Sequence, residues 1–300
     1  MDLVKQQHNK KVVLLAITSV IASVLFSFLG APFLRAFAVS TGSKVFWSVG
    51  TVFVASLFFL GIHDTQISQA AVYVGAIWMT LGSYNEMEKR GINWKQAGSV
   101  SLLLGILFAS AGYFYLSLTH AKSEILNQLI DPLHKAILTA FPENPVDINT
   151  LMGVLPGIFI ASLFGALAFG FLLESRVVKL FGFQKFKVVS SLKWLEFRLP
   201  DLFIWASLFS LLFSVVNFGI KPLQIISINI LIVSTVAYLI QGLTVVEFMM
   251  RYMRFGPVSK TLTYLFVFFQ LAPFVVFIGL VDYWADFRKF VRRRAKSKEA

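Results

Sequence analysis

The sequence predicts an all-α fold, a polytopic transmembrane helical bundle with about eight spans. Hydrophobic residues occupy 57% of the 300 positions and charged residues only 14%. A soluble domain of this length cannot bury that much apolar surface, because its core grows more slowly than its chain. Apolar runs of about twenty residues recur along the sequence, and each is long enough to cross roughly 30 Å of hydrocarbon.

The first apolar run has two interpretations. It follows a basic start and precedes the small-residue tripeptide Ala36-Phe37-Ala38, as in a cleavable signal peptide. Its length, Val12 to Gly30, exceeds an ordinary signal core, and Arg35 interrupts the approach to the cleavage site. We therefore expect an uncleaved first helix. The predicted spans lie near residues 12–30, 44–62, 66–84, 97–118, 151–173, 202–219, 223–249 and 261–281.

Two connections between the spans are long. Between spans four and five, leucine and isoleucine recur at helical spacing, opposite polar residues, which is typical of amphipathic helices in the membrane interface. Because Pro132 follows Asp131, we expect two short interfacial helices within residues 120–142, the second capped by Asp131. Residues 174–201 form a basic amphipathic connector that leads to a helix entry at Pro200 and Asp201.

The net charge of +12 does not indicate a nucleic-acid partner. The 27 Lys and Arg lie mostly in tails and loops, where they orient the chain and contact lipid headgroups. No basic stretch is interleaved with aromatics in a soluble module. The basic residues divide almost equally between the two sides of the membrane, so they do not fix the orientation. The basic tail at residues 287–300 favours cytoplasmic termini.

Small residues at four-residue spacing predict close helix packing. We expect the three stripes to pack within this chain, with docking of a partner helix as the alternative. The stripes are Ser19, Ser23, Ser27 and Ala31; Ala97, Ser101, Gly105 and Ala109; and Gly153, Gly157, Ala161 and Gly165.

Familiar enzyme signatures are absent from the sequence. No nucleotide-binding GxxxxGK[ST] loop, HExxH motif or Gly-x-Ser-x-Gly elbow occurs, and there is no cysteine. His63-Asp64 lies in a short turn, where an exposed helix cap is favoured over a metal pair. The sequence predicts no enzyme, cofactor or metal, although an intramembrane enzyme with unfamiliar residues stays open.

The seventh span carries the most polar face. Ser227, Ser234, Tyr238 and Gln241 share one stripe, and Asn229 and Glu247 project in one direction. Lipid offers no partner to an amide or carboxylate, so this face is expected to point into the bundle. The functional interpretation is a ligand-binding cavity. In the alternative, Asn229 and Gln241 hold helices together, and Glu247 pairs with Arg251 one turn away.

The last span ends in charged residues. Gln270 and Pro273 predict a kink that faces the bundle. Asp282 and Asp286 lie one turn apart and are followed by Arg288 and Lys289. Interfacial anchoring is the favoured explanation. The alternative is a docking site for protein or lipid, made by Asp282, Arg288, Lys289, Arg292, Arg293 and Arg294.

Three motifs carry a resemblance. LKWLEFRLPDLFIW (192–205), IQGLTVV (240–246) and GLVDYWADFRKF (279–290) resemble the YybS-like bacterial membrane proteins, an uncharacterised family of about eight spans. If the resemblance holds, the motif residues of that family correspond in this chain to the following positions: Trp194, Pro200, Asp201, Gln241, Gly242, Gly279, Asp282 and Arg288.

A more distant similarity is to the substrate-binding subunits of energy-coupling-factor transporters, which implies membrane or ATPase partner subunits. Those subunits have about six spans. Their first-helix Ala-x-x-x-Ala coupling motif is not reproduced here, because Ala16 is followed four positions later by Val20.

Together, these patterns predict a multi-pass protein of the bacterial cytoplasmic membrane that binds a small-molecule or lipid-like ligand. It would serve as a transporter component. The expected lining is Asn229, Ser234, Tyr238, Gln241 and Glu247, with Arg198 and Asp201 near an entrance. The alternative is a non-transporting scaffold that recruits partners through its interfacial helix and basic tail.

Overall fold

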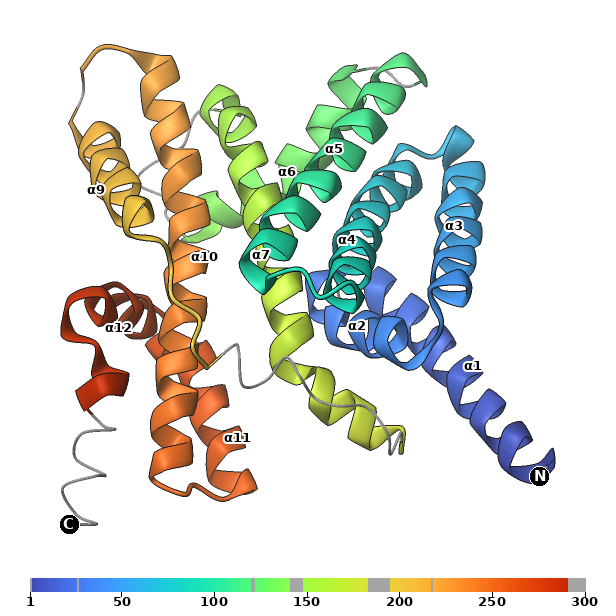
Figure 1. Cartoon of the computed structure of the whole chain (residues 1–300). Helices are drawn as coiled ribbons and strands as arrows, with labels where there is room; N and C mark the ends of the chain where they lie inside the picture. Colours follow the sequence, from blue (N-terminus) through green and yellow to red (C-terminus); the bar gives the residue numbers. More distant parts are fainter. Residues whose placement is uncertain are drawn as a thin grey trace, which may run out of the picture. The chain divides into compact units, whose positions relative to one another are not determined.

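The computed structural model describes residues 2–25, 27–119, 122–140, 148–182, 195–216 and 218–290 (Figure 1). Throughout these ranges, the regular structure is helical, which confirms the all-α prediction. The chain divides into two compact units, Met1–Val188 and Val189–Ala300, which we call the N-terminal unit and the C-terminal unit.

The N-terminal unit is built around α4, whose buried side chains lie along most of its length. Helices α2, α3, α5 and α7 all pack against α4. Asp64 begins this helix as its N-cap, because its carboxylate accepts hydrogen bonds from Gln66 N (2.8 Å) and Ile67 N (3.3 Å). The predicted cap at His63-Asp64 is therefore confirmed. The elements are α1 (Asp2–Leu25), η1 (Ser27–Gly30), α2 (Ala31–Ser40), α3 (Ser43–Leu60), η2 (Gly61–His63), α4 (Thr65–Lys89), α5 (Trp94–Thr119), α6 (Lys122–Ala140) and α7 (Ile148–Leu180).

The first predicted helix ends earlier than expected. α1 stops at Leu25, and a 3-10 turn leads into α2, which packs against α1. At Gly30 the backbone lies so close to Ala22 that a β-carbon would collide with it. The Ser19 hydroxyl donates to Phe33 O at 2.8 Å. The serine stripe of the first span thus packs against the next segment of the same chain.

A second small-residue stripe also packs within the chain. Ala97, Ser101 and Gly105 are buried on α5. A β-carbon at Gly105 would collide with the Thr80 hydroxyl of α4, so the glycine allows the two helices to approach closely. This arrangement confirms the expectation of packing within the chain for this stripe.

The helix between α5 and α7 differs from the prediction. α6 is one helix that continues through Pro132, so the expected break into two short helices was wrong. Ile130, which precedes the proline by two residues, is buried, and α6 packs against α4, α5 and α7. Proline lacks the N–H group that would make one backbone hydrogen bond of this helix. Packing of the apolar face stabilises the helix in spite of that missing bond.

The C-terminal unit is organised by α10, which packs against α9 and α12. The predicted last span, residues 261–281, is divided rather than continuous. A π-helical turn precedes Pro273, whose missing N–H interrupts the regular hydrogen-bond ladder. The predicted irregularity is thus confirmed, but Gln270 is exposed rather than facing the bundle. The elements are α9 (Asp201–Val215), α10 (Lys221–Tyr252), α11 (Pro257–Phe266), η3 (Val267–Leu271) and α12 (Ala272–Ala285).

Four helical segments in the described ranges are long and apolar enough to cross a membrane: Ser43–His63, Trp94–Thr119, Ile148–Leu180 and Lys221–Tyr252. Shorter apolar helices occupy Phe28–Ser40, Asp201–Val215 and Ala272–Ala285. A 15-residue helix such as α9 rises only about 22 Å, less than the roughly 30 Å of a bilayer core. The architecture is that of a helical membrane protein with several apolar spans.

Candidate functional site

The candidate site in the C-terminal unit begins at a close crossing of α10 and α12. A β-carbon at Gly242 would collide with Val275 O, and one at Gly279 would collide with Tyr238 O. Two glycines on facing helices therefore bring the two backbones into direct contact. This crossing fixes the side chains that project beside it.

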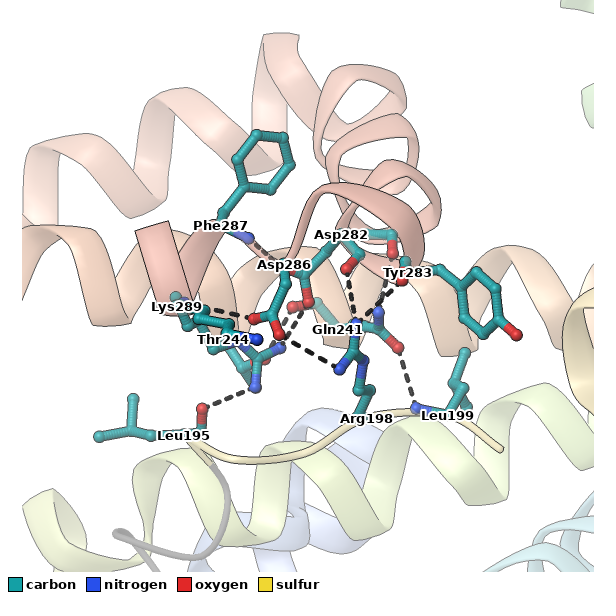
Figure 2. A network of polar contacts seen from close by, with 12 residues as sticks. Leu195, Arg198, Leu199, Gln241, Thr244, Asp282, Tyr283, Asp286, Phe287 and Lys289 are labelled. Atoms are coloured by element: carbon teal, nitrogen blue, oxygen red, sulfur yellow. Dashed lines mark hydrogen bonds and ion pairs between the residues drawn. The ribbon is translucent and has the colours of Figure 1, made fainter. Parts of the chain in front are cut away.

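Gln241 lies at the crossing and is only 1% exposed. Its Oε1 accepts a hydrogen bond from Leu199 N at 3.0 Å, and its Nε2 donates to Gly279 O at 2.9 Å (Figure 2). One amide side chain thus joins α10, α12 and the segment that precedes α9. Both bonds go to backbone groups, so Gln241 stabilises the arrangement of three segments.

Arg198 caps the end of α12. Its Nη2 donates to the carbonyl oxygens of Asp282 (3.1 Å) and Tyr283 (2.9 Å), and its Nη1 lies 3.5 Å from Asp286 Oδ2. The last carbonyls of a helix lack intrahelical partners and carry a partial negative charge, which a guanidinium satisfies. Figure 2 shows Arg198 beside this end of the helix.

A buried ion pair lies beneath this cap. Asp282 Oδ2 is 3.1 Å from Arg288 Nη2, with the two residues 2% and 7% exposed. The chain reverses after α12 at Asp286, whose φ of 42° is left-handed. Arg288 Nη1 then donates to Leu195 O at 2.8 Å and Nη2 to Thr244 Oγ1 at 3.3 Å, while Phe287 N donates to Asp282 Oδ1 at 3.1 Å.

An open cleft of about 350 Å³ lies over this network. Three acidic and three basic residues line the cleft: Glu196, Arg198, Asp282, Asp286, Arg288 and Lys289. The buried Asp282–Arg288 pair is its floor, and Glu196 and Lys289 are exposed at its rim. We refer to this feature as the charged cleft.

The other polar residues of α10 are placed elsewhere. Ser234 accepts a hydrogen bond from Ser207 of α9 at 2.9 Å, and the Tyr238 ring packs against Phe203 with centroids 6.0 Å apart. Asn229 is half-buried and donates to Ile225 O of its own helix at 2.8 Å. The structure therefore places Gln241 against Leu199, the sequence neighbour of Arg198, while Ser234 and Tyr238 face α9. Asp201, the first residue of α9, is exposed.

Glu247 is held by several partners. Its carboxylate accepts hydrogen bonds from Arg251 Nε (2.7 Å), Lys260 Nζ (3.1 Å) and the Tyr264 hydroxyl (2.7 Å). The predicted pair with Arg251 is confirmed, and the two partners from α11 extend it. Glu247 thereby fixes the hairpin of α10 and α11.

The residues proposed for docking have different environments. Asp282 and Arg288 are buried partners of each other, whereas Lys289 is exposed. Arg292, Arg293 and Arg294 lie outside the described residues. In the described ranges, no cluster of three or more His, Asp or Glu side chains could hold a metal ion.

A second polar cluster, in the N-terminal unit, was not predicted. Arg35 of α2 is 1% exposed, and its guanidinium contacts carboxylates of two other helices. Nε donates to Glu174 Oε2 at 3.0 Å, Nη1 donates to Asn85 Oδ1 at 3.1 Å, and Nη2 donates to Glu88 Oε2. We call these four residues the arginine cluster. The sequence did contain a signal for this cluster, because Arg35 is a lone arginine in an apolar segment. Burying an arginine in such a segment costs free energy unless the arginine is paired.

Comparison with known proteins gives one match. Residues 12–283 match the model of a protein family, DUF2232, whose description is "Predicted membrane protein". Neither the curated proteins nor the solved structures contain a match to this chain.

Proposed function

Because the chain belongs to the DUF2232 family of predicted membrane proteins, we propose that it is a multi-pass protein of the bacterial cytoplasmic membrane that binds a ligand in the charged cleft. The ligand would be a small molecule or lipid headgroup that carries charges of both signs. The expected count of eight spans is retained in this proposal. It combines the four long apolar segments with α1, α4, α9 and the segment of α11 and α12.

The observation that carries the proposal is the combination of an open cleft with a rigid charged floor. Asp282 and Arg288 are fixed by hydrogen bonds to Phe287, Thr244 and Leu195, so the floor is pre-organised. Ligand sites are typically concave and contain a few polar groups in fixed positions. An equal number of acidic and basic lining residues suits a zwitterion better than an ion of one sign.

The sequence interpretation placed the ligand deeper, beside Gln241 and Tyr238. Gln241 uses both ends of its amide on backbone groups, and the glycines bring α10 and α12 together there. We therefore place the ligand in the charged cleft, with Arg198 as the predicted residue that both interpretations share. A role as the substrate-binding part of a transporter would require a partner that supplies energy.

Mass spectrometry of the purified protein tests this proposal. The full chain would be isolated in mild detergent, and the bound molecules would be compared between the wild type and Asp286→Asn. Asparagine tolerates the left-handed backbone at this position but lacks the charge. Asp201→Asn is the matched control, because Asp201 is exposed and does not line the cleft.

We expect a zwitterionic lipid or metabolite to accompany the wild type and the control, and to be depleted about tenfold in Asp286→Asn, the equivalent of about 1.4 kcal/mol. Equal retention by all three proteins would refute binding in the cleft. Loss of a partner protein on removal of residues 291–300, with unchanged small-molecule content, would instead favour the scaffold function.

A further inference from the structure

The exposed basic side chains of the N-terminal unit gather where several helix ends meet. Lys11 Nζ, in the first half of α1, donates to Gly182 O just beyond the end of α7 at 3.3 Å. Lys89 Nζ, at the end of α4, donates to Ser43 Oγ at the start of α3 at 2.9 Å. Arg35 of α2 links the two pairs, because it contacts carboxylates near the ends of α4 and α7. The start of α5 lies here as well, since α5 begins five residues after α4 ends. We call this side of the unit the basic end, and its exposed lysines and arginines are Lys10, Lys11, Lys44, Lys89, Arg90, Lys95, Arg176 and Lys179.

The opposite end of the unit differs in charge. Helices α3, α4, α5 and α7 run between the two ends (Figure 1). The turn from α3 to α4 contains His63 and Asp64 but no lysine or arginine, and Ser68 Oγ closes it by donating to Gly61 O at 2.6 Å. The last two turns of α5 and the first two turns of α7 contain no charged residue. The α6 helix, which follows α5, has as many acidic as basic residues: Glu124, Asp131, Lys122 and Lys135.

The segment of α1 and α2 does not connect the two ends. From Lys11 to Leu25, α1 rises about 21 Å, less than the roughly 30 Å of a bilayer core. In the turn that follows, Phe28 packs against Phe169 of α7, with ring centroids 5.9 Å apart. About 31 Å of helix separates Phe169 from the first residue of α7, but only about 16 Å separates it from the last.

The α2 helix returns to the basic end. Its residue Ala38 accepts a hydrogen bond from Asn85 Nδ2 near the end of α4 at 3.0 Å. The chain therefore enters at the basic end with α1 and is back at the same end when α3 begins. The proposed eight spans do not include this return. Because the return reverses the side of every later connection in the unit, it explains why alternating spans divided the basic residues almost equally.

Exposed apolar side chains accompany the charges of the basic end. Val45, next to Lys44, is 47% exposed, and Leu180, next to Lys179, is 77% exposed. Lys95 Nζ lies 5.7 Å from the ring centroid of Trp94. Tryptophan and lysine side chains are typical of the membrane–water interface. A phospholipid presents an anionic headgroup beside an acyl chain, whereas a soluble polyanion offers no apolar part, so the basic end fits a phospholipid better.

We propose that the basic end is the cytoplasmic face of the N-terminal unit and that it binds anionic phospholipid headgroups of the cytoplasmic leaflet. Lysine and arginine in short connections are enriched on the cytoplasmic side, and the negative surface potential of that leaflet attracts them. The turn at His63 and Asp64 then faces the outside of the cell. The charged cleft belongs to the other unit, so the two sites can be tested separately.

Cysteine labelling tests the orientation. The chain has no cysteine, so each single-cysteine variant reports on one position. Lys44→Cys, Lys95→Cys and His63→Cys replace exposed residues and would be treated in spheroplasts with a maleimide that does not cross membranes. His63→Cys should react in intact spheroplasts, whereas Lys44→Cys and Lys95→Cys should react only after permeabilisation. Reaction of Lys44→Cys or Lys95→Cys in intact spheroplasts would overturn the proposed orientation, and so would protection of His63→Cys until permeabilisation.

Native mass spectrometry tests the lipid partner. The full protein would be equilibrated with equal amounts of phosphatidylglycerol and phosphatidylcholine, and the lipids that stay bound would be identified. The wild type should retain more phosphatidylglycerol, and this preference should fall about fivefold in Lys44→Gln/Lys95→Gln. Lys135→Gln/Lys221→Gln is the matched control, because it removes two exposed lysines outside the basic end and should keep the preference. Equal retention of both lipids by the wild type would refute anionic-lipid binding, as would an equal preference in the two double variants.

Discussion

Gly279 of α12 lies directly against the carbonyl oxygen of Tyr238 on α10, with no room for a β-carbon between them. Gly242 makes the reciprocal approach to Val275. In a bilayer, where apolar side chains gain little by leaving lipid, such backbone proximity is a main source of helix association. The close crossing also brings Gly279 O within hydrogen-bonding distance of the Gln241 side chain.

Gly279→Ala is expected to separate α10 from α12 and to lower the unfolding temperature clearly. The added methyl group would collide with backbone atoms, which cannot move aside as a flexible side chain can. Gly256→Ala is the control, because a β-carbon at Gly256 meets nothing within 4 Å. Thermal unfolding in detergent measures both variants. Equal unfolding temperatures would show that the close crossing is not important for stability.

Gln241→Leu should destabilise the protein because it leaves Leu199 N–H and Gly279 C=O without their partner. An unsatisfied buried polar group costs roughly 1–3 kcal/mol, so the combined loss for the two groups should be about 2–6 kcal/mol. Gln224→Leu on the same helix is the control, since Gln224 is exposed. The measurement is resistance to denaturant in detergent. If Gln241→Leu keeps full stability but loses a bound molecule, Gln241 contacts a ligand after all.

Arg288→Met should be far more damaging than Lys289→Met, although the two residues are neighbours. Removing Arg288 leaves the Asp282 carboxylate buried without its cation, which typically costs about 3–5 kcal/mol. Lys289 is exposed, and its loss should cost less than about 0.5 kcal/mol. Unfolding in denaturant compares the two variants.

A double variant separates the charge effect from lost packing. Adding Asp282→Asn to Arg288→Met removes the stranded charge and should recover part of the stability. If the double variant is as unstable as the sum of the two single variants, the two side chains are not coupled.

Much of the architecture could be predicted from the sequence. Long apolar runs identify transmembrane helices whatever their neighbours are, and small residues four apart mark close packing, as at Gly105. The boundary between α1 and α2 was missed, although Gly30 and Pro32 mark the start of α2. Pro132 gave a misleading signal, because tertiary packing carries α6 across it.

The candidate site was predictable only in part. Polar residues on α10 indicated an inward face, and Gln241, Tyr238 and Ser234 are indeed buried. Their partners could not be read from the sequence, because the Gln241 contacts are backbone groups 38 and 42 residues away. Arg288 followed a helix end and looked like part of a tail, but a left-handed turn at Asp286 directs it into the interior.

Arg35→Met should destabilise the N-terminal unit more than Arg90→Met. Arg35 is buried and contacts two carboxylates, whereas Arg90 is exposed at the end of α4. Without Arg35, the buried Glu174 and the partly exposed Glu88 would both lose a cation that they contact, at a cost of up to about 3–5 kcal/mol. Lowering the pH should restore part of the stability of Arg35→Met, because protonation neutralises the carboxylates that have lost this cation. Thermal unfolding at pH 7 and pH 5 measures both effects, and an Arg35→Met variant that is equally unstable at both pH values would show that lost packing, rather than charge, is responsible.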